Sequence, residues 1–94
     1  MAIRNFRHKG LERLFVEDNA RGLSPALASK IKRMLFVLAN ATNVSDMELF
    51  PGWRLHSLRG DLRGFWSLTV TGNWRIIFRF ENGEVCDVDL VDYH

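Results

Sequence analysis

The spacing of apolar residues changes once along this chain, and that change is what most constrains the fold. Between residues 11 and 38, apolar residues recur three or four positions apart, which is the period of an amphipathic helix. From Trp53 onward they alternate with polar residues, which is the period of a half-buried strand. The pattern predicts an α+β fold in which helices come first and a meander of neighbouring strands follows.

Two helices are expected in the first half of the chain. The apolar spacing around Leu11 and Leu14 predicts a short helix that ends near the DNARG stretch at 18–22. A second helix is predicted to begin with Ser24 as its cap and Pro25 at its first position. Its buried stripe is expected to comprise Leu27, Ile31, Met34, Leu35 and Leu38.

Shorter elements are expected around these helices. The segment IRNF at 3–6 is a weakly indicated first strand, and SDMELF at 45–50 is a short helical turn that the following Pro-Gly pair would end. The segments WRLHSL at 53–58 and GFWSLTV at 64–70 alternate and are predicted strands. Gly72–Asn73 fits a tight hairpin turn, and Asn82–Gly83 is the stronger signal because both residues tolerate the positive φ of a type I′ turn.

Register can be counted outward from the second turn. The count places Ile77 opposite Val88 and Arg75 opposite Leu90. If the last strand is regular to its end, four side chains share one face there: Arg75, Leu90, Asp92 and His94. Tyr93 would point to the other face, as a core tyrosine would.

Charge is distributed unevenly along the sequence. The chain of 94 residues has 13 Lys and Arg, 11 Asp and Glu, and a net charge of +2. All 13 cations precede residue 81 together with six acids, whereas five acids and no Lys or Arg follow, so the two regions carry +7 and −5. A basic body suits a polyanion such as RNA or DNA. Many small proteins are mildly basic without binding nucleic acid, so charge leaves that choice open.

Several classes of protein are disfavoured by composition. No apolar run approaches the ~18 residues of a spanning helix, and the N-terminus lacks a secretory h-region, so a cytoplasmic protein is expected. A single cysteine, Cys86, excludes an internal disulfide, and the scattered histidines do not form a usual metal set. The absence of linkers and repeats predicts one domain over residues 1–94.

His56 and His94 are the candidates for proton transfer, because an imidazole has an unperturbed pKa near ~6.5. Arg75 lies in an otherwise apolar strand, where its charge requires an anion. That anion is either Asp92 or the chain-end carboxylate, or it is a bound phosphate. Cleavage of RNA by its own 2′-hydroxyl uses such groups and needs no metal. His8, next to a lysine, is expected to be an ordinary surface residue.

Four stretches resemble one family. They are FRHKGLERLF at 6–15, RLHSLRGDLRGFWSLTV at 54–70, GNWRIIFRF at 72–80 and DVDLVDYH at 87–94, and together they resemble the HigB branch of the RelE/ParE-like bacterial toxins. The resemblance covers almost the whole chain in order. It implies a RelE-like fold, in which two N-terminal helices pack on a small, mainly antiparallel twisted sheet.

The resemblance also implies a function. Such a toxin is a ribosome-dependent mRNA endoribonuclease, an mRNA interferase, which cuts mRNA in the A site of the 70S ribosome through 2′-hydroxyl attack and needs no cofactor. A HigA-like helix-turn-helix antitoxin would neutralise it and link it to operator DNA, and no membrane is involved. The exposed faces of the two N-terminal helices are the expected docking surface for this antitoxin.

By resemblance the site divides into two sets. The catalytic set is His56, Arg75, Asp92, Tyr93 and His94, and Arg59 is the RNA-binding residue. Arg54 and Arg63 are weaker candidates for contacts with the RNA backbone, and the resemblance does not supply them. Arg59 stands where a lysine is common, so phosphate geometry is open to change. Arg54 and Arg63 would otherwise form a solvated face. Two other functions compete: an RNA- or ribosome-binding module that does not cleave, and a ParE-like toxin with a target other than RNA.

Overall fold

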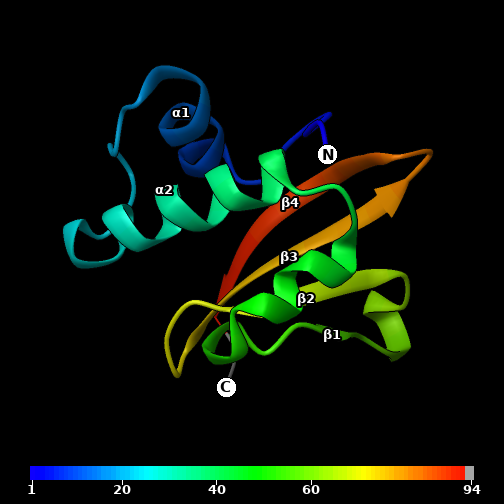
Figure 1. The fold of residues 1–94 in the computed structure, drawn as a ribbon. Helices are drawn as coiled ribbons and strands as arrows, with labels where there is room; N and C mark the ends of the chain where they lie inside the picture. Colours follow the sequence, from blue (N-terminus) through cyan, green and yellow to red (C-terminus); the bar gives the residue numbers. More distant parts are fainter. Residues whose placement is uncertain (93–94) are drawn as a thin grey trace.

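A computed structural model of the chain describes residues 1–92, and Tyr93 and His94 lie outside the described residues. The elements in chain order are α1 (Lys9–Glu17), α2 (Pro25–Asn40), the 3-10 helices η1 (Val44–Leu49) and η2 (Pro51–Trp53), β1 (His56–Ser57), η3 (Gly60–Leu62), β2 (Phe65–Thr69), β3 (Trp74–Glu81) and β4 (Glu84–Asp92). The strands form one antiparallel sheet in the order β1-β2-β3-β4. Both helices lie on the same face of that sheet (Figure 1). The predicted α+β architecture is therefore confirmed.

Both predicted helices form where the sequence places them. The imidazole Nδ1 of His8 accepts a hydrogen bond from the main-chain N–H of Leu11 at 3.2 Å and so caps α1. The helix ends where Asp18 turns into the left-handed region with a φ of 55°. Helix α2 begins at Pro25 as expected, although the side chain of Ser24 makes no capping hydrogen bond.

The core lies between the helices and one face of the sheet. The helices contribute Leu11, Leu14, Ile31, Met34, Leu35 and Leu38, and the sheet contributes Leu68, Ile76, Phe78, Val85 and Val88. Met47 of η1 and Trp53 of η2 extend this cluster, so the 3-10 helices cover the same face. Leu27, which was predicted in the stripe, is only half-buried and packs at its margin. We call the opposite side, away from α1 and α2, the far face of the sheet.

The first predicted strand of the meander is much shorter than expected. Only His56–Ser57 pairs with β2, because the turn begun by Pro51 continues as a 3-10 helix through Trp53. The ring of Trp53 stacks on that of Phe50 with their centroids 4.1 Å apart, which places the indole in the core from a helical turn. Arg54 then takes a left-handed φ of 48° before the strand begins.

The segment at 3–6 does not form a regular strand. Ile3 and Phe6 instead make isolated parallel bridges to Val85 and Val88. The N-terminal segment therefore runs beside β4 and leads directly into α1 (Figure 1).

One predicted turn is confirmed and the other is wrong. Asn82 and Gly83 have φ values of 52° and 79°, as a type I′ hairpin turn requires. The connection between β2 and β3 spans residues 70–73 and Gly72 takes no positive φ, so it is not a tight two-residue turn. The loop is wider than predicted because the side chain of Arg75 donates hydrogen bonds to its main-chain carbonyls and holds it open.

A β-bulge in β4 overturns the predicted register. The pairing of Glu81 with Glu84 is confirmed, but the register shifts by one residue between Ile77 and Arg79, so that Ile77 lies opposite Asp89. Asp87, with a φ of 53°, is the inserted residue. The predicted pairs Ile77 with Val88 and Arg75 with Leu90 are therefore wrong, and the observed partners are Asp89 and Val91.

The bulge also changes which side chains share a face. Asp92 lies opposite Trp74, which packs against the core, whereas Arg75 lies opposite Val91 on the far face. Arg75 and Asp92 therefore belong to opposite faces of the sheet, contrary to the sequence-based prediction. His94, the other member of the predicted group, lies outside the described residues.

Candidate active site

His56 and Arg75 lie on the far face of the sheet. Cross-strand pairs place His56 opposite Ser67, and Ser67 opposite Ile77, in one row. Arg75 lies opposite Thr69 in the adjacent row. Standard strand spacing separates the Cα atoms of His56 and Arg75 by roughly 12 Å.

The ring of His56 is held in one tautomer. Its Nδ1 lies 2.9 Å from the main-chain oxygen of Arg54. Because a carbonyl oxygen only accepts hydrogen bonds, Nδ1 carries the proton, and Nε2 of the neutral ring keeps its lone pair. The left-handed backbone at Arg54 turns its carbonyl toward the ring. An exposed imidazole with a free lone pair at Nε2 is suited to take a proton from a substrate.

Arg75 fixes the loop between β2 and β3. Its Nη1 donates to the carbonyl oxygens of Thr71 at 2.7 Å, Gly72 at 3.2 Å and Trp74 at 3.3 Å. The hydroxyl of Thr71 in turn accepts from the main-chain N–H of Trp74 at 3.4 Å. The guanidinium is thus anchored at one end of the sheet, half-buried and in a defined orientation.

The predicted RNA-binding arginines surround β1. Arg54 directly follows η2, and Arg59 and Arg63 flank η3 in the loop between β1 and β2. All three are exposed, and within residues 1–92 none of them forms an ion pair. Together with His56 they form a basic rim around the shortest strand.

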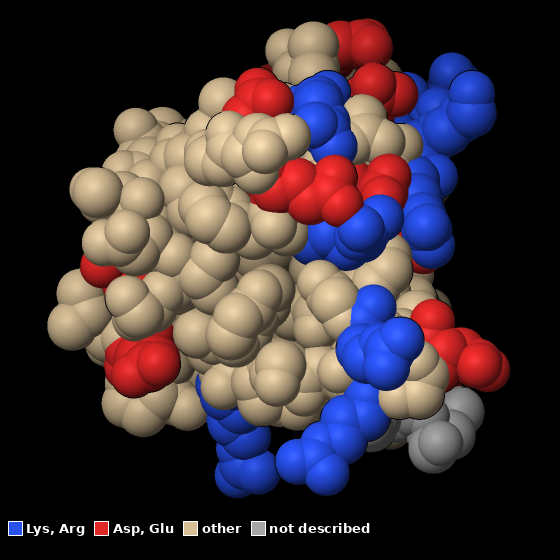
Figure 2. All heavy atoms as spheres, turned by 90° about the vertical axis from the view of Figure 1, so that its right-hand side faces the viewer, with Lys and Arg blue, Asp and Glu red and all other residues tan. Residues whose placement is uncertain are grey.

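Folding neutralises much of the uneven charge seen in the sequence. Three acids of the last segment pair with arginines: Glu81 with Arg4 and Arg79, Glu84 with Arg4, and Asp87 with Arg7 and Arg79. Figure 2 views the side of the molecule that carries the β3–β4 turn and the β1–β2 loop. It shows acidic side chains interleaved with basic ones above, and basic side chains alone reaching out along the lower edge. Positive charge is therefore concentrated locally and does not cover the whole body.

Some notable residues were not predicted from the sequence. Ser67, opposite His56, is only 1% exposed, and within residues 1–92 its hydroxyl makes no hydrogen bond. Arg7 and Arg79 lie over the ring of Phe65, 5.1 and 5.9 Å from its centroid.

His8 caps α1 and is not an ordinary surface residue, contrary to the prediction. Its position directly before a predicted helix was the signal available for that role.

The remaining predicted residues are placed as follows. Asp92 is exposed at the end of β4 and belongs to the face opposite Arg75, so the fold does not bring it to the far face. Tyr93 and His94 lie outside the described residues. Among residues 1–92, no group of three His, Cys, Asp or Glu side chains is placed to hold a metal ion. In the same part of the chain no helix has the length and apolar character to cross a membrane.

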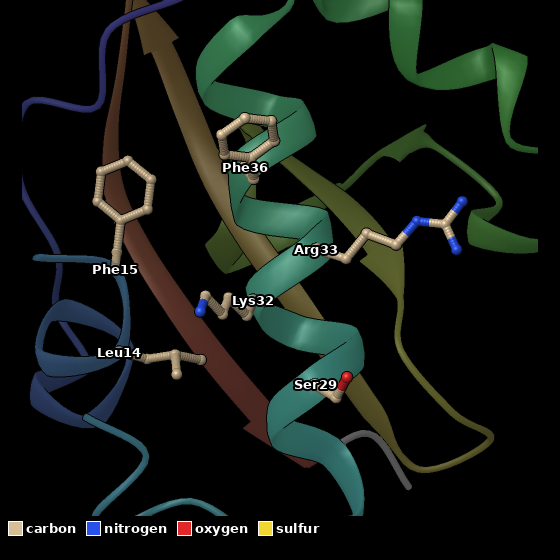
Figure 3. A pocket seen from close by; sticks show the side chains of 6 residues that line it. All are labelled: Leu14, Phe15, Ser29, Lys32, Arg33 and Phe36. Atoms are coloured by element: carbon tan, nitrogen blue, oxygen red, sulfur yellow. The ribbon is translucent and has the colours of Figure 1, made fainter. Parts of the chain in front are cut away.

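A second surface feature lies on the helical side. A groove between the helices is lined by Leu14 and Phe15 of α1 and by Ser29, Lys32, Arg33 and Phe36 of α2. Figure 3 shows Leu14 and Lys32 pointing toward one another across the gap between the helices, while Arg33 points to the other side of α2. A second hollow adjoins it on the other side of Phe36 and is lined by Val37, Asn40, Ala41, Asp46, Met47, Leu49 and Phe50.

Comparison with known proteins identifies close relatives in sequence. A family described as the RelE-like toxin of type II toxin-antitoxin system HigB matches residues 4–94. The chain is 37% identical over 92 residues to Endoribonuclease HigB of Proteus vulgaris, and the match covers 98% of this chain and 99% of that protein. It is 33% identical over 79 residues to Toxin HigB-1 of Vibrio cholerae, covering 83% of each.

Solved structures with the same fold are more distant in sequence. YafQ from E. coli superimposes with a TM-score of 0.65 at 15% identity, covering 96% of this chain and 92% of that one. The YoeB-YefM complex from Staphylococcus aureus gives a TM-score of 0.60 at 13% identity, covering 100% and 99% of the two chains. These similarities establish the shared fold.

Proposed function

The chain belongs to the HigB family of RelE-like toxins of type II toxin-antitoxin systems, and from this premise we propose that it is an endoribonuclease that cuts mRNA in the A site of the 70S ribosome. The observation that carries the proposal is the contact between Nδ1 of His56 and the main-chain oxygen of Arg54, which leaves Nε2 of the neutral ring as a proton acceptor on the far face of the sheet. The relative named Endoribonuclease HigB supports the reaction class. Cleavage of the message would stop translation.

The reaction proposed is attack by the RNA's own 2′-hydroxyl. Nε2 of His56 removes the hydroxyl proton, the 2′-oxygen bonds to phosphorus, and the bond from phosphorus to the 5′-oxygen breaks. The products are a 2′,3′-cyclic phosphate and a 5′-hydroxyl. The leaving oxygen takes its proton from a second residue that acts as the acid, and we assign this role to His94. Arg75 stabilises the charge that develops on the phosphate oxygens. No metal or cofactor takes part in this scheme.

The other assigned residues bind and orient the substrate. Arg59, with Arg54 and Arg63, would contact the RNA backbone, which is supported by their exposed positions around β1 and by the absence of ion pairs at all three within residues 1–92. Asp92 would orient a neighbouring cation, because a carboxylate facing a phosphate directly would repel it. Tyr93 would stack on a base. The ribosome would present the message as an unpaired strand to this basic rim.

The proposed partner is a HigA-like antitoxin with a helix-turn-helix. Membership in a type II toxin-antitoxin family supports an antitoxin partner. Operator DNA would then be contacted through the antitoxin in the complex. Because both the translating ribosome and the operator are in the cytoplasm, the protein is expected to act there.

The test is a translating extract supplied with the chain alone or with its antitoxin, in which mRNA ends are mapped. We expect cuts within A-site codons, cyclic phosphate ends, and protection by the antitoxin. Cleavage of a message carrying a 2′-deoxy nucleotide at the cut position would disprove the mechanism. Equal cleavage of free RNA and ribosome-bound RNA would disprove ribosome dependence.

Two further outcomes identify the competing functions. A non-cleaving RNA-binding module would retain full toxicity when His94 is replaced by alanine. A ParE-like toxin would leave all messages intact and act on a different target.

A further inference from the structure

We propose that the groove between the helices and the hollow that adjoins it at Phe36 together form the docking site for a helical, acidic segment of the antitoxin. We call these two hollows together the groove along α2. This inference rests on the proposed function, because it names the surface by which the same toxin meets its partner. The groove lies on the helical side of the sheet, whereas His56 and Arg75 lie on the far face. It can therefore be altered without touching the catalytic residues.

Three of the five large apolar residues that are exposed within residues 1–92 line this surface, and Val16 and Phe80 do not. Phe36 is 65% exposed and Leu49 is 79% exposed, which is costly for side chains of this size in water. Phe15 of α1 is 37% exposed and lines the same surface. Contiguous exposed apolar surface of this kind marks an interaction site in a soluble domain.

The two hollows form one continuous track. Their lining residues from α2 are Ser29, Lys32, Arg33, Phe36, Val37 and Asn40, which recur every three or four positions. They therefore occupy one outward stripe of α2, and Phe36 is shared by both hollows. The stripe covers about three helical turns, or roughly 16 Å. An amphipathic helix of similar length, with one large apolar side chain for each hollow, matches this shape.

Charge at one end of the track defines the partner further. Lys32 and Arg33 border the first hollow. Lys32 is paired with Asp18, whereas Arg33 forms no ion pair within residues 1–92. In the second hollow, Asp46 is occupied by the main-chain N–H groups of Thr42 and Asn43. The unmatched charge at the border of the first hollow is thus positive and lies on the outer side of α2, so the docking helix is expected to carry Asp or Glu on the flank that faces Arg33.

The experiment compares antitoxin affinity of groove variants by calorimetry, with the cognate antitoxin and the full toxin chain. Phe36→Glu and Leu49→Glu should each raise Kd roughly 30-fold or more, as loss of a central interface anchor does. Arg33→Glu should raise Kd roughly tenfold, with an effect that shrinks in high salt. Phe80→Glu is the matched control, since Phe80 is 38% exposed but lies on the sheet outside the groove.

Cleavage is measured on the same variants, so that failure of the two proposals can be told apart. Phe36→Glu should cut mRNA like the wild type yet escape neutralisation by the antitoxin. Wild-type Kd in both Phe36→Glu and Leu49→Glu would overturn the docking site. It would also be overturned if Phe36→Glu dissolved a toxin dimer in sedimentation while leaving antitoxin affinity unchanged, because the groove would then serve a second copy of the chain. If the wild-type toxin did not cleave mRNA at all, that result would contradict the proposed function and leave the docking site unaffected.

Discussion

His56 on β1 lies directly opposite Ser67 on β2, and this pairing sets the imidazole on the face of the sheet away from both helices. The pair is one of only two cross-strand pairs that β1 makes with β2. The position of the ring therefore depends on the backbone just before it, where the Arg54 carbonyl fixes Nδ1.

Replacing His56 by alanine should abolish most of the cleavage. Removing a general base typically costs about 10² to 10⁴ in rate. We expect kcat to fall within that range while RNA binding is retained, as measured by single-turnover cleavage on programmed ribosomes. His8→Asn is the matched histidine control, because asparagine also caps helices and should preserve both α1 and activity. Undiminished cleavage by His56→Ala would exclude it as the base.

Arg75→Lys should separate the structural role of this residue from its catalytic role. Lysine keeps the charge but lacks the planar fork that bonds the carbonyls of Thr71 and Gly72. We expect kcat to fall by more than about tenfold and unfolding free energy to fall by about 1 kcal/mol, because the loop loses directed hydrogen bonds. Urea titration and cleavage assays on the same preparation measure the two effects. Full cleavage by a variant with reduced stability would assign Arg75 to the loop alone.

Asn5→Ala should loosen the bulge in β4. The side chain of Asn5 donates to Oδ1 of Asp87 at 2.9 Å and accepts from its main-chain N–H at 3.0 Å, so it supports the left-handed backbone of that residue. Loss of both bonds should cost about 1–2 kcal/mol and raise amide exchange near Val88. Arg4→Ala removes only exposed ion pairs near the hairpin turn and should cost under about 1 kcal/mol. Equal effects of the two variants would contradict this role for Asn5.

Cys86 should resist alkylation in the folded protein. Burial raises the pKa of its thiol, so the folded state keeps the proton that the unfolded state releases as pH rises. Stability should therefore fall as pH increases through the ordinary thiol range, and iodoacetamide at about pH 8.5 should label the native protein far more slowly than the unfolded one. Mass spectrometry measures the labelling. Equal rates in urea and in buffer would show that the thiol is accessible.

Local signals predicted local structure well. The Ser24–Pro25 start of α2 and the Asn82–Gly83 turn each depend on a few adjacent residues, and both are confirmed. Charge pairing was harder to foresee, because Glu81 and Asp87 find arginines that are distant in sequence.

The predicted register of β4 was wrong for a reason that is not local. The inserted Asp87 is bonded to Asn5, 82 positions away in the chain, and the core takes both Val85 and Val88 from the same strand. A register counted outward from the Asn82–Gly83 turn uses only the residues of the hairpin, so it includes neither the bond to Asn5 nor the burial of both valines. The predicted grouping of Arg75 with Asp92 was lost with the register, whereas the common face of His56 and Arg75 follows from shorter hairpins.

The parallel bridges from Ile3 and Phe6 to β4 have a consequence for how the protein is made. The segment that leads into α1 completes its pairing only after β4 has emerged, since chains leave the exit tunnel N-terminus first. A nascent chain that has released only α1 and α2 has neither the sheet beneath its helices nor the partner of its leading segment. The sheet that carries His56 and Arg75 can therefore be completed only after β4 has left the tunnel.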